Sequence, residues 1–236
     1  MGTTNDVILG SDKQQILRRG ESLGAFYGLQ FAGIVQQGED VSKLPSVNGQ
    51  IPKPGDLKFA DTDGNGRIDG NDRVILGSTQ PKIVYGFSSQ FSYRGFDVSA
   101  SFSGSYGNKV YNALERRLEQ TGDSYNVLTT VLDSWTPANG SQTLPLATNA
   151  RPFSYIDSRY VQNASYLKLR NLTVGYHLKI KELKKLKIEG IRLYDTASNL
   201  FTITPYKGYD PEVSSGTDSG VYPASRTFTF GVNISL

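Results

Sequence analysis

The chain of 236 residues contains no cysteine, which excludes a disulfide framework, a thiol nucleophile and a cysteine metal site. Its formal net charge of only +3 gives no reason to expect a nucleic-acid partner. With 25 glycines, 14 tyrosines and 11 phenylalanines it is rich in strand and turn residues, and no apolar run approaches the ~18–20 residues of a membrane helix. The first predicted element lies in GAFYGLQFAGIVQ (24–36), which favours one or two strands.

The strongest chemical motif is DTDGNGRIDGND (61–72), which matches an EF-hand-type calcium loop. Gly66 permits the sharp turn, and Ile68 is expected to anchor the loop to an apolar neighbour. No helix-forming run precedes the loop. The predicted ligands offer oxygens that converge as the loop curls: Asp61, Asp63, Asn65, Arg67 through its carbonyl, Asp69 directly or through water, and Asp72 in place of the usual glutamate. We predict a structural calcium ion here; the alternative is an Asp/Gly-rich turn that binds nothing.

Two long strands are predicted at residues 83–93 and 96–106. Each alternates apolar with small or polar side chains, and a period of two indicates an extended strand with one apolar face. The Arg94-Gly95 pair between them predicts a tight hairpin turn. Each strand runs for about 11 residues, the length that crosses a bilayer, whereas strands of soluble sheets usually have about 5–6.

The side chains of this hairpin favour a membrane barrel over the outer strands of a soluble sandwich. Serines line the polar face, which suits the wall of a water-filled lumen. Aromatic residues stand towards both ends, as the girdles of a membrane barrel do: Tyr93 and Phe96 at one end, Tyr85 and Tyr106 at the other. We therefore expect the apolar side chains of the hairpin to face lipid: Phe87, Phe91, Val98 and Phe102.

A short helix is predicted in the long connection after the hairpin. Within 108–122, Val110, Leu114 and Leu118 are spaced by four, Asn108 can cap the first turn and Gly122 can stop the last. An amphipathic loop helix fits this pattern.

Three more strands are predicted further along the chain. In 165–178 the apolar parity changes between Leu169 and Leu172, so the first half either carries a bulge or projects beyond the membrane. The stretch 187–201 is a weaker strand in which Asp195 shares the apolar parity. The last stretch, 225–236, alternates up to Leu236.

The connection lengths indicate the topology. The turns at 94–95 and 179–187 are short, while the connections 107–164 and 202–224 are long. Outer-membrane barrels combine short periplasmic turns with long extracellular loops. The predicted fold class is therefore all-β: antiparallel strands of an outer-membrane β-barrel with long extracellular loops, a short loop helix and the loop 61–72 on the extracellular side.

Several segments together resemble a known family. PGDLKFADTDGNGRIDGNDRVILGSTQPKIVYGFSSQFSYRGFDVSASFSGSYGNKVYN, SWTPAN, SYLKLRNLTVGY, SNLFTIT, GYDPEV and the closing strand resemble the corresponding regions of SusC/RagA-type TonB-dependent outer-membrane transporters. The resemblance covers the last quarter of such a protein. Residues 1–236 are thus expected to be the C-terminal portion of the barrel. The Met-Gly start is expected to be the start of a truncated reading frame or of a cloned fragment.

The resemblance implies a function in the cell outer membrane. Such transporters import oligosaccharides or peptides, driven by TonB and the proton-motive force, beneath a SusD-like surface lipoprotein. The partners it implies are that lipoprotein, the TonB complex through segments outside this chain, the lipid bilayer and a glycan or peptide substrate. It implies no enzyme activity. The alternative is a soluble, secreted, calcium-stabilised β domain for carbohydrate binding or adhesion.

Overall fold

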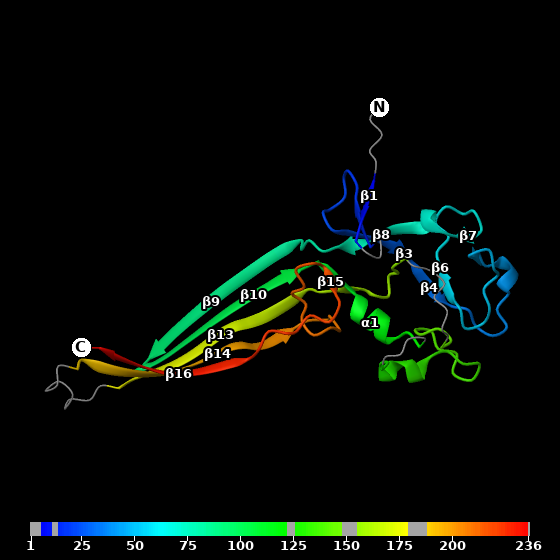
Figure 1. Cartoon of the computed structure of the whole chain (residues 1–236). Helices are drawn as coiled ribbons and strands as arrows, with labels where there is room; N and C mark the ends of the chain where they lie inside the picture. The colour runs from blue at the N-terminus through cyan, green and yellow to red at the C-terminus, as the bar shows by residue number, and fades with distance from the viewer. Residues whose placement is uncertain (1–5, 11–13, 122–125, 148–154, 179–187, 236) are drawn as a thin grey trace. The chain divides into compact units, whose positions relative to one another are not determined.

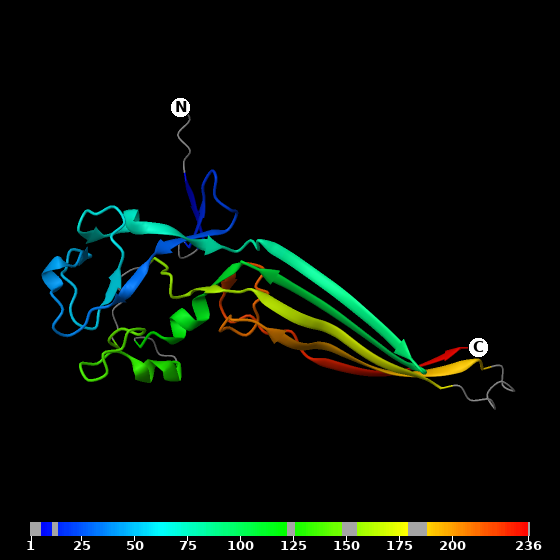
Figure 2. The ribbon, with the colours of Figure 1, turned by 180° about the vertical axis from the view of Figure 1, so that it is seen from behind.

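The computed structural model describes residues 6–10, 14–121, 126–147, 155–178 and 188–235 (Figures 1 and 2). The chain forms two compact units. The loop unit comprises Met1–Gln80, Asn108–Asn163 and Glu212–Val221, and the sheet unit comprises Pro81–Gly107, Ala164–Pro211 and Tyr222–Leu236. None of the helices in the described ranges is long and apolar enough to cross a membrane.

The sheet unit is one antiparallel sheet of five strands in the order β16-β14-β13-β10-β9 (Figure 1). The strands are β9 (Ile83–Tyr93), β10 (Phe96–Tyr106), β13 (Tyr166–Leu178), β14 (Gly190–Ile203) and β16 (Thr227–Ser235). All five lie where the alternation predicted them. The turn between β9 and β10 uses the left-handed region twice, at Arg94 (φ 46°) and Gly95 (φ 90°), as a type I′ hairpin requires.

One face of this sheet is apolar across all five strands. Residues directly opposite each other in a ladder share a face, and Val98 of β10 pairs with Phe91 of β9 and with Val174 of β13. The rings of Phe87 and Phe102 stack with centroids 4.5 Å apart. Many of these side chains are exposed, Phe91 to 65% and Phe230 to 71%. The four residues expected to face lipid therefore lie together on one face.

Asp195 lies on this same face, as its parity predicted. It is opposite Val174 on β13 and Phe230 on β16, and it is exposed. Among the described residues its carboxylate has no ion-pair partner.

The change of parity in β13 is a β-bulge at Arg170. In the ladder with β10, Phe102 pairs with Leu169 and Ser101 pairs with Asn171, so that Arg170 has no opposite residue. One extra residue turns the strand by half a period. Leu167 and Leu169 therefore share the apolar face with Leu172 despite their opposite parity. The predicted bulge is confirmed, and the Arg170 Nε donates to Ser103 Oγ at 2.6 Å.

The opposite face of the sheet is polar and cross-linked between strands. Arg192 of β14 donates through Nε to Asp97 Oδ1 of β10 at 3.0 Å, and His177 Nε2 of β13 lies 3.2 Å from the same oxygen. The Arg192 side chain reaches Asp97 across Gly175. A Cβ at Gly175 would lie 2.6 Å from both partners, so only glycine leaves room for this ion pair.

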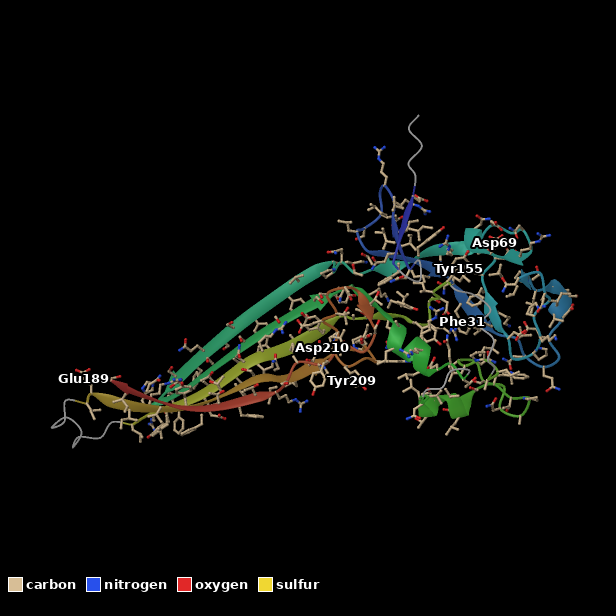
Figure 3. The ribbon with its side chains drawn as sticks, in the orientation of Figure 1. Phe31, Asp69, Tyr155, Glu189, Tyr209 and Asp210 are labelled. Carbon is tan, nitrogen blue, oxygen red and sulfur yellow. The ribbon has the colours of Figure 1, made fainter. Side chains whose placement is uncertain are left out.

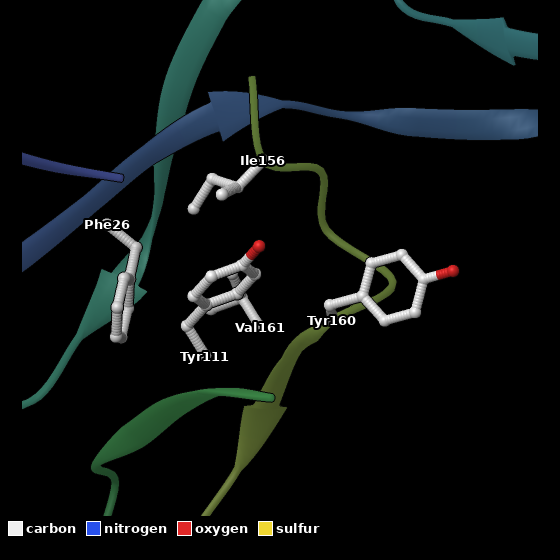
Figure 4. Packing of buried hydrophobic residues seen from close by; sticks show 5 residues of the cluster. All are labelled: Phe26, Tyr111, Ile156, Tyr160 and Val161. Carbon is white, nitrogen blue, oxygen red and sulfur yellow. The ribbon is translucent and has the colours of Figure 1, made fainter. Parts of the chain in front are cut away.

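The loop unit is built from short elements. A four-stranded sheet has the order β1-β2-β3-β8, and smaller sheets pair β4 with β6, β5 with β7, and β11 with β12 and β15. The bounds are β1 (Val7–Leu9), β2 (Gln15–Leu17), β3 (Ala25–Leu29), β4 (Phe31–Ile34), η1 (Val41–Lys43), β5 (Ser46–Val47), β6 (Leu57–Phe59), β7 (Arg67–Ile68), η2 (Gly70–Asp72), β8 (Arg73–Ser78), β11 (Lys109–Asn112), α1 (Ala113–Leu118), η3 (Thr129–Asp133), β12 (Val161–Asn163) and β15 (Thr217–Asp218). The main core cluster consists of Phe26, Tyr111, Ile156, Tyr160 and Val161 (Figure 4).

The helix predicted over 108–122 is wrong in its first part. Residues Lys109–Asn112 form β11, and α1 covers only Ala113–Leu118. Asn112 is the cap in place of Asn108, since its side chain accepts a hydrogen bond from the Glu115 amide at 2.9 Å. Long-range contacts favour the strand over the helix here. Val110 and Tyr111 are only 2% and 1% exposed, and their backbone pairs with β12. Gly122, the predicted turn 179–187 and Leu236 lie outside the described residues.

Candidate metal centre

The predicted calcium loop lies in the loop unit between β6 and β8. Its middle forms β7, which pairs in parallel with β5, so that Arg67 is opposite Ser46 and Ile68 opposite Val47. Ile68 is 2% exposed and packs in a cluster with Leu29 and Phe59. The predicted anchoring role of Ile68 is therefore confirmed.

The first half of the loop is wound around the Asp61 carboxylate. Its Oδ1 accepts from the Gly64 amide at 2.8 Å, and its Oδ2 accepts from the Gly66 amide at 2.8 Å. Gly64 and Gly66 have φ values of 71° and 75°, which side-chain-bearing residues rarely adopt. The sharp turn predicted at Gly66 is thus present.

These amide donors also stabilise the ionised form of the Asp61 carboxyl. The hydrogen bond from Gly66, helped by those from Gly64 and Asn65, holds the pKa of the Asp61 carboxyl below its ordinary value. A group with a depressed folded-state pKa stabilises the fold above its unfolded pKa of about 3.9. This stabilisation is lost as the pH falls through the lowered pKa, so the loop geometry is fully supported at neutral pH.

Asp72 ties the two ends of the loop together from a buried position. Its side chain is 0% exposed, Oδ1 accepts from the Thr62 amide at 2.8 Å and Oδ2 accepts from the Asp69 amide at 2.8 Å. Asp69 in turn caps the short helix η2, since its Oδ1 accepts from the Asn71 amide at 2.7 Å. The two aspartates form a capping box around η2.

Three of the four predicted carboxylate ligands converge. One carboxylate oxygen each from Asp61, Asp63 and Asp72 lies within 4.8 Å of the other two. The Asn65 side chain adjoins this group, since its Nδ2 donates to Asp63 Oδ2 at 2.9 Å while its Oδ1 accepts from the Arg67 amide at 2.8 Å. The Asp69 carboxylate lies outside the group and caps η2. An all-oxygen donor set of this kind fits a hard divalent cation such as calcium.

The length and the two unlike faces of the strands in the sheet unit are typical of one class of protein, the membrane β-barrels. Five antiparallel strands of 9 to 14 residues, polar on one face and exposed and aromatic on the other, form a segment of a membrane β-barrel wall.

Comparison with known proteins identifies the class more closely. The chain is 36% identical over 237 residues to TonB-dependent receptor P3 of Formosa agariphila, covering 94% of this chain and 23% of the relative. It is 33% identical over 186 residues to TonB-dependent receptor SusC of Bacteroides thetaiotaomicron, covering 78% of this chain and 18% of the relative. A solved structure of the RagAB peptide importer in the open-open state superposes with a TM-score of 0.77 at 26% identity, covering 98% of this chain and 24% of that one. No family model matches the chain.

The chain is thus homologous to a segment of the SusC/RagA-type TonB-dependent receptors, and the resemblance drawn from the sequence is confirmed. It spans about a quarter of the length of the relatives that it matches.

Proposed function

We propose that this chain forms part of the barrel wall of a TonB-dependent transporter in the cell outer membrane. The observation that carries the proposal is the register of the sheet unit, which gathers aromatic and aliphatic side chains from all five strands on one exposed face. An exposed apolar surface that extends over five long strands is costly in water but matches a lipid environment. The polar face, with its serine and threonine side chains, then lines the interior.

The names of the relatives support an inference about the transported substrate and the partners. The RagAB structure is that of a peptide importer, and SusC is a TonB-dependent receptor. We infer that the whole protein imports oligosaccharides or peptides together with a SusD-like surface lipoprotein, and that the TonB complex supplies the energy. The chain would contribute wall and loops to this process, with no enzyme chemistry. The exposed aromatic face and the homology both disfavour the alternative of a soluble secreted β module.

Accessibility of single cysteines tests the membrane orientation, and residues 1–236 contribute no native cysteine to the background. Phe91 and Gln90 are neighbours on opposite faces of β9. With a nitroxide label at Phe91→Cys, relaxation by oxygen, which concentrates in lipid, is expected to exceed relaxation by a water-soluble nickel complex. The matched label at Gln90→Cys is expected to give the opposite ratio. If both sites prefer the nickel complex, the apolar face does not meet lipid.

We also propose that the loop 61–72 holds one calcium ion on the extracellular side. The Asp61, Asp63 and Asp72 carboxylates would be the central ligands, with Asn65, Asp69 and the Arg67 carbonyl completing the shell directly or through water. The topology of the chain supports the extracellular side. Short turns such as Arg94-Gly95 are periplasmic in outer-membrane barrels. The loop 61–72 precedes the other end of β9, which would then be the extracellular end. Bound calcium would offset the mutual repulsion of the carboxylates and stiffen the loop.

Calorimetric titration of calcium into the full-length protein tests this site. We expect one site with a dissociation constant of about 10⁻⁴–10⁻³ M, the range of extracellular calcium modules. The variants Asp61→Ala and Asp63→Ala are expected to lose the binding heat, since each removes one of three converging carboxylates. Asp133→Ala, which removes an exposed carboxylate elsewhere in the loop unit, is the control. Equal heats from all four proteins would leave only an Asp-rich turn.

A further inference from the structure

An aromatic cluster surrounds the turn of the β9-β10 hairpin on the apolar face of the sheet unit. Tyr93 pairs with Phe96 at the turn, and Phe96 pairs with Tyr176 of β13, with ring centroids 4.5 Å apart. All three side chains are exposed, to 57%, 55% and 38%. Figure 3 marks Glu189 at this end of the sheet and Tyr209 towards the other end. Such a band of aromatic side chains is typical of the level where a barrel wall meets lipid headgroups.

Arg94 occupies the first position of this turn with a left-handed backbone. Its φ is 46°, a conformation that glycine, asparagine and aspartate adopt more readily than arginine. The chain therefore gives up some stability of the turn by carrying arginine here, and such positions occur most often at functional sites. Among the described residues, none forms an ion pair with the guanidinium or accepts a hydrogen bond from it. Its N–H donors are thus available to a ligand.

The Arg94 guanidinium is held on the apolar side of the turn. Its central carbon lies 5.2 Å from the centroid of the Tyr93 ring, and that ring stacks with Phe91 of the apolar face at 6.5 Å. Stacking on the ring orients the guanidinium and leaves the N–H donors at its edge free. The acidic residue nearest in sequence, Asp97, lies on the polar face and is paired with Arg192. The positive charge of Arg94 is therefore not neutralised by the hairpin itself.

We propose that Arg94 and the aromatic cluster bind the phosphate of an anionic phospholipid in the periplasmic leaflet. A guanidinium presents paired donors that match two oxygens of a phosphate group. Beside it, the apolar face continues from Phe91 and Val98 to the stacked rings of Phe87 and Phe102. Acyl chains therefore find an apolar surface directly next to the cation. This combination fits a lipid and not a free phosphate ion.

The charges around the turn favour an anionic lipid over a zwitterionic one. A zwitterionic headgroup brings a cation beside its phosphate, and that cation needs a carboxylate as its partner. Asp195, on the same face, lies on β14, with β13 between that strand and the hairpin. A lipid with a net negative charge, such as phosphatidylglycerol, complements Arg94 without a second partner. The inference rests on the proposed function, because it requires the apolar face to meet lipid and the turn to be periplasmic.

Native mass spectrometry of the full-length protein in detergent tests this site, because it resolves individual bound lipids. The protein is titrated with dioleoyl phosphatidylglycerol and, separately, with dioleoyl phosphatidylcholine, and the first is expected to bind more tightly. Arg94→Asn is expected to weaken the tightest phosphatidylglycerol site by about tenfold, the loss of one hydrogen bond to a charged group. Arg94→Lys keeps the charge but loses the paired donors, so its affinity is expected to lie between the two.

The choice of asparagine separates lipid binding from folding. Asparagine suits the left-handed turn position, so Arg94→Asn in lipid-free detergent is expected to melt at or above the temperature of the wild type. Added phosphatidylglycerol is then expected to raise the melting temperature of the wild type more than that of the variant. Arg19→Asn, the same substitution at an exposed arginine of the loop unit, is the matched control and is expected to bind the lipid like the wild type.

Three results would overturn the proposal: Arg94→Asn binds phosphatidylglycerol as tightly as the control, phosphatidylcholine binds equally well, or millimolar inorganic phosphate displaces the lipid. The cysteine accessibility measurement on β9 keeps this inference separate from the proposed function. A lipid-facing Phe91 with unchanged lipid binding in Arg94→Asn refutes the lipid site alone, whereas a water-facing Phe91 refutes the barrel wall.

Discussion

Deletion of residues 228–236 is expected to abolish accumulation of the full-length protein in the outer membrane. This segment makes up nearly all of β16, which pairs with Gly190–Ser198 of β14. Without it, backbone N–H and C=O groups of β14 lose their partners within the membrane, and each unsatisfied group in lipid costs several kcal/mol. The measurement is the amount of protein in the outer-membrane fraction, together with its heat-dependent migration on a gel.

A conservative change in the same strand separates the backbone ladder from side-chain effects. Thr229→Ser keeps every backbone partner and a hydroxyl on the polar face, so assembly is expected to match the wild type. Normal surface levels of the deletion variant would show that pairing between β14 and β16 is dispensable, which the proposed barrel wall does not allow.

The variant Gly104→Val is expected to destabilise the sheet unit by about 3 kcal/mol, at the upper end for an overpacked site. Gly104 pairs with Tyr85 of β9, and the Tyr85 ring lies over it. The Tyr85 hydroxyl donates to the Tyr166 carbonyl of β13 at 2.9 Å, so that one side chain reaches across β10. A Cβ at position 104 would collide with both this ring and that carbonyl.

Thermal unfolding in detergent measures this effect. A loss of about 3 kcal/mol lowers the melting temperature by about 6–12 °C for a chain of this size. Gly190→Val is the matched control, because the nearest atom to a Cβ there is the Leu178 carbonyl oxygen at 3.9 Å. An unchanged melting temperature for Gly104→Val would mean that the contact between Tyr85 and Gly104 carries no stability.

The long strands could be predicted because each repeats one simple signal many times. Over the 11 residues of β9 and of β10, apolar side chains recur at every second position except at Ser89 and Gly104, and a period of two is the signature of a strand, not of a helix. The bulge in β13 was predictable for the same reason, since a change of parity in a long run has few physical explanations. The acidic loop was also visible, because its aspartates and glycines stand at fixed spacings along the chain.

The loop unit could not be derived in the same way. Strands such as β5 and β7 have 2 residues each, too few to show a period. Val110 and Tyr111 fit a helical spacing as well as a strand, and long-range pairing decided for the strand. A cavity beside the loop 61–72 is lined by residues near position 48, near position 69 and at position 155. No local pattern connects these segments.

The bulge at Arg170 has a consequence for comparing this chain with its relatives. Without Arg170, the apolar positions 167, 169, 172 and 174 would follow one another at every second place. The bulge is therefore one inserted residue, and a relative with an unbroken β13 would be one residue shorter at this point. An alignment that places the gap anywhere else in the strand equates positions of the apolar face with positions of the polar face along part of its length. Substitution patterns read from such an alignment would then assign the wrong chemistry to both sides of the wall.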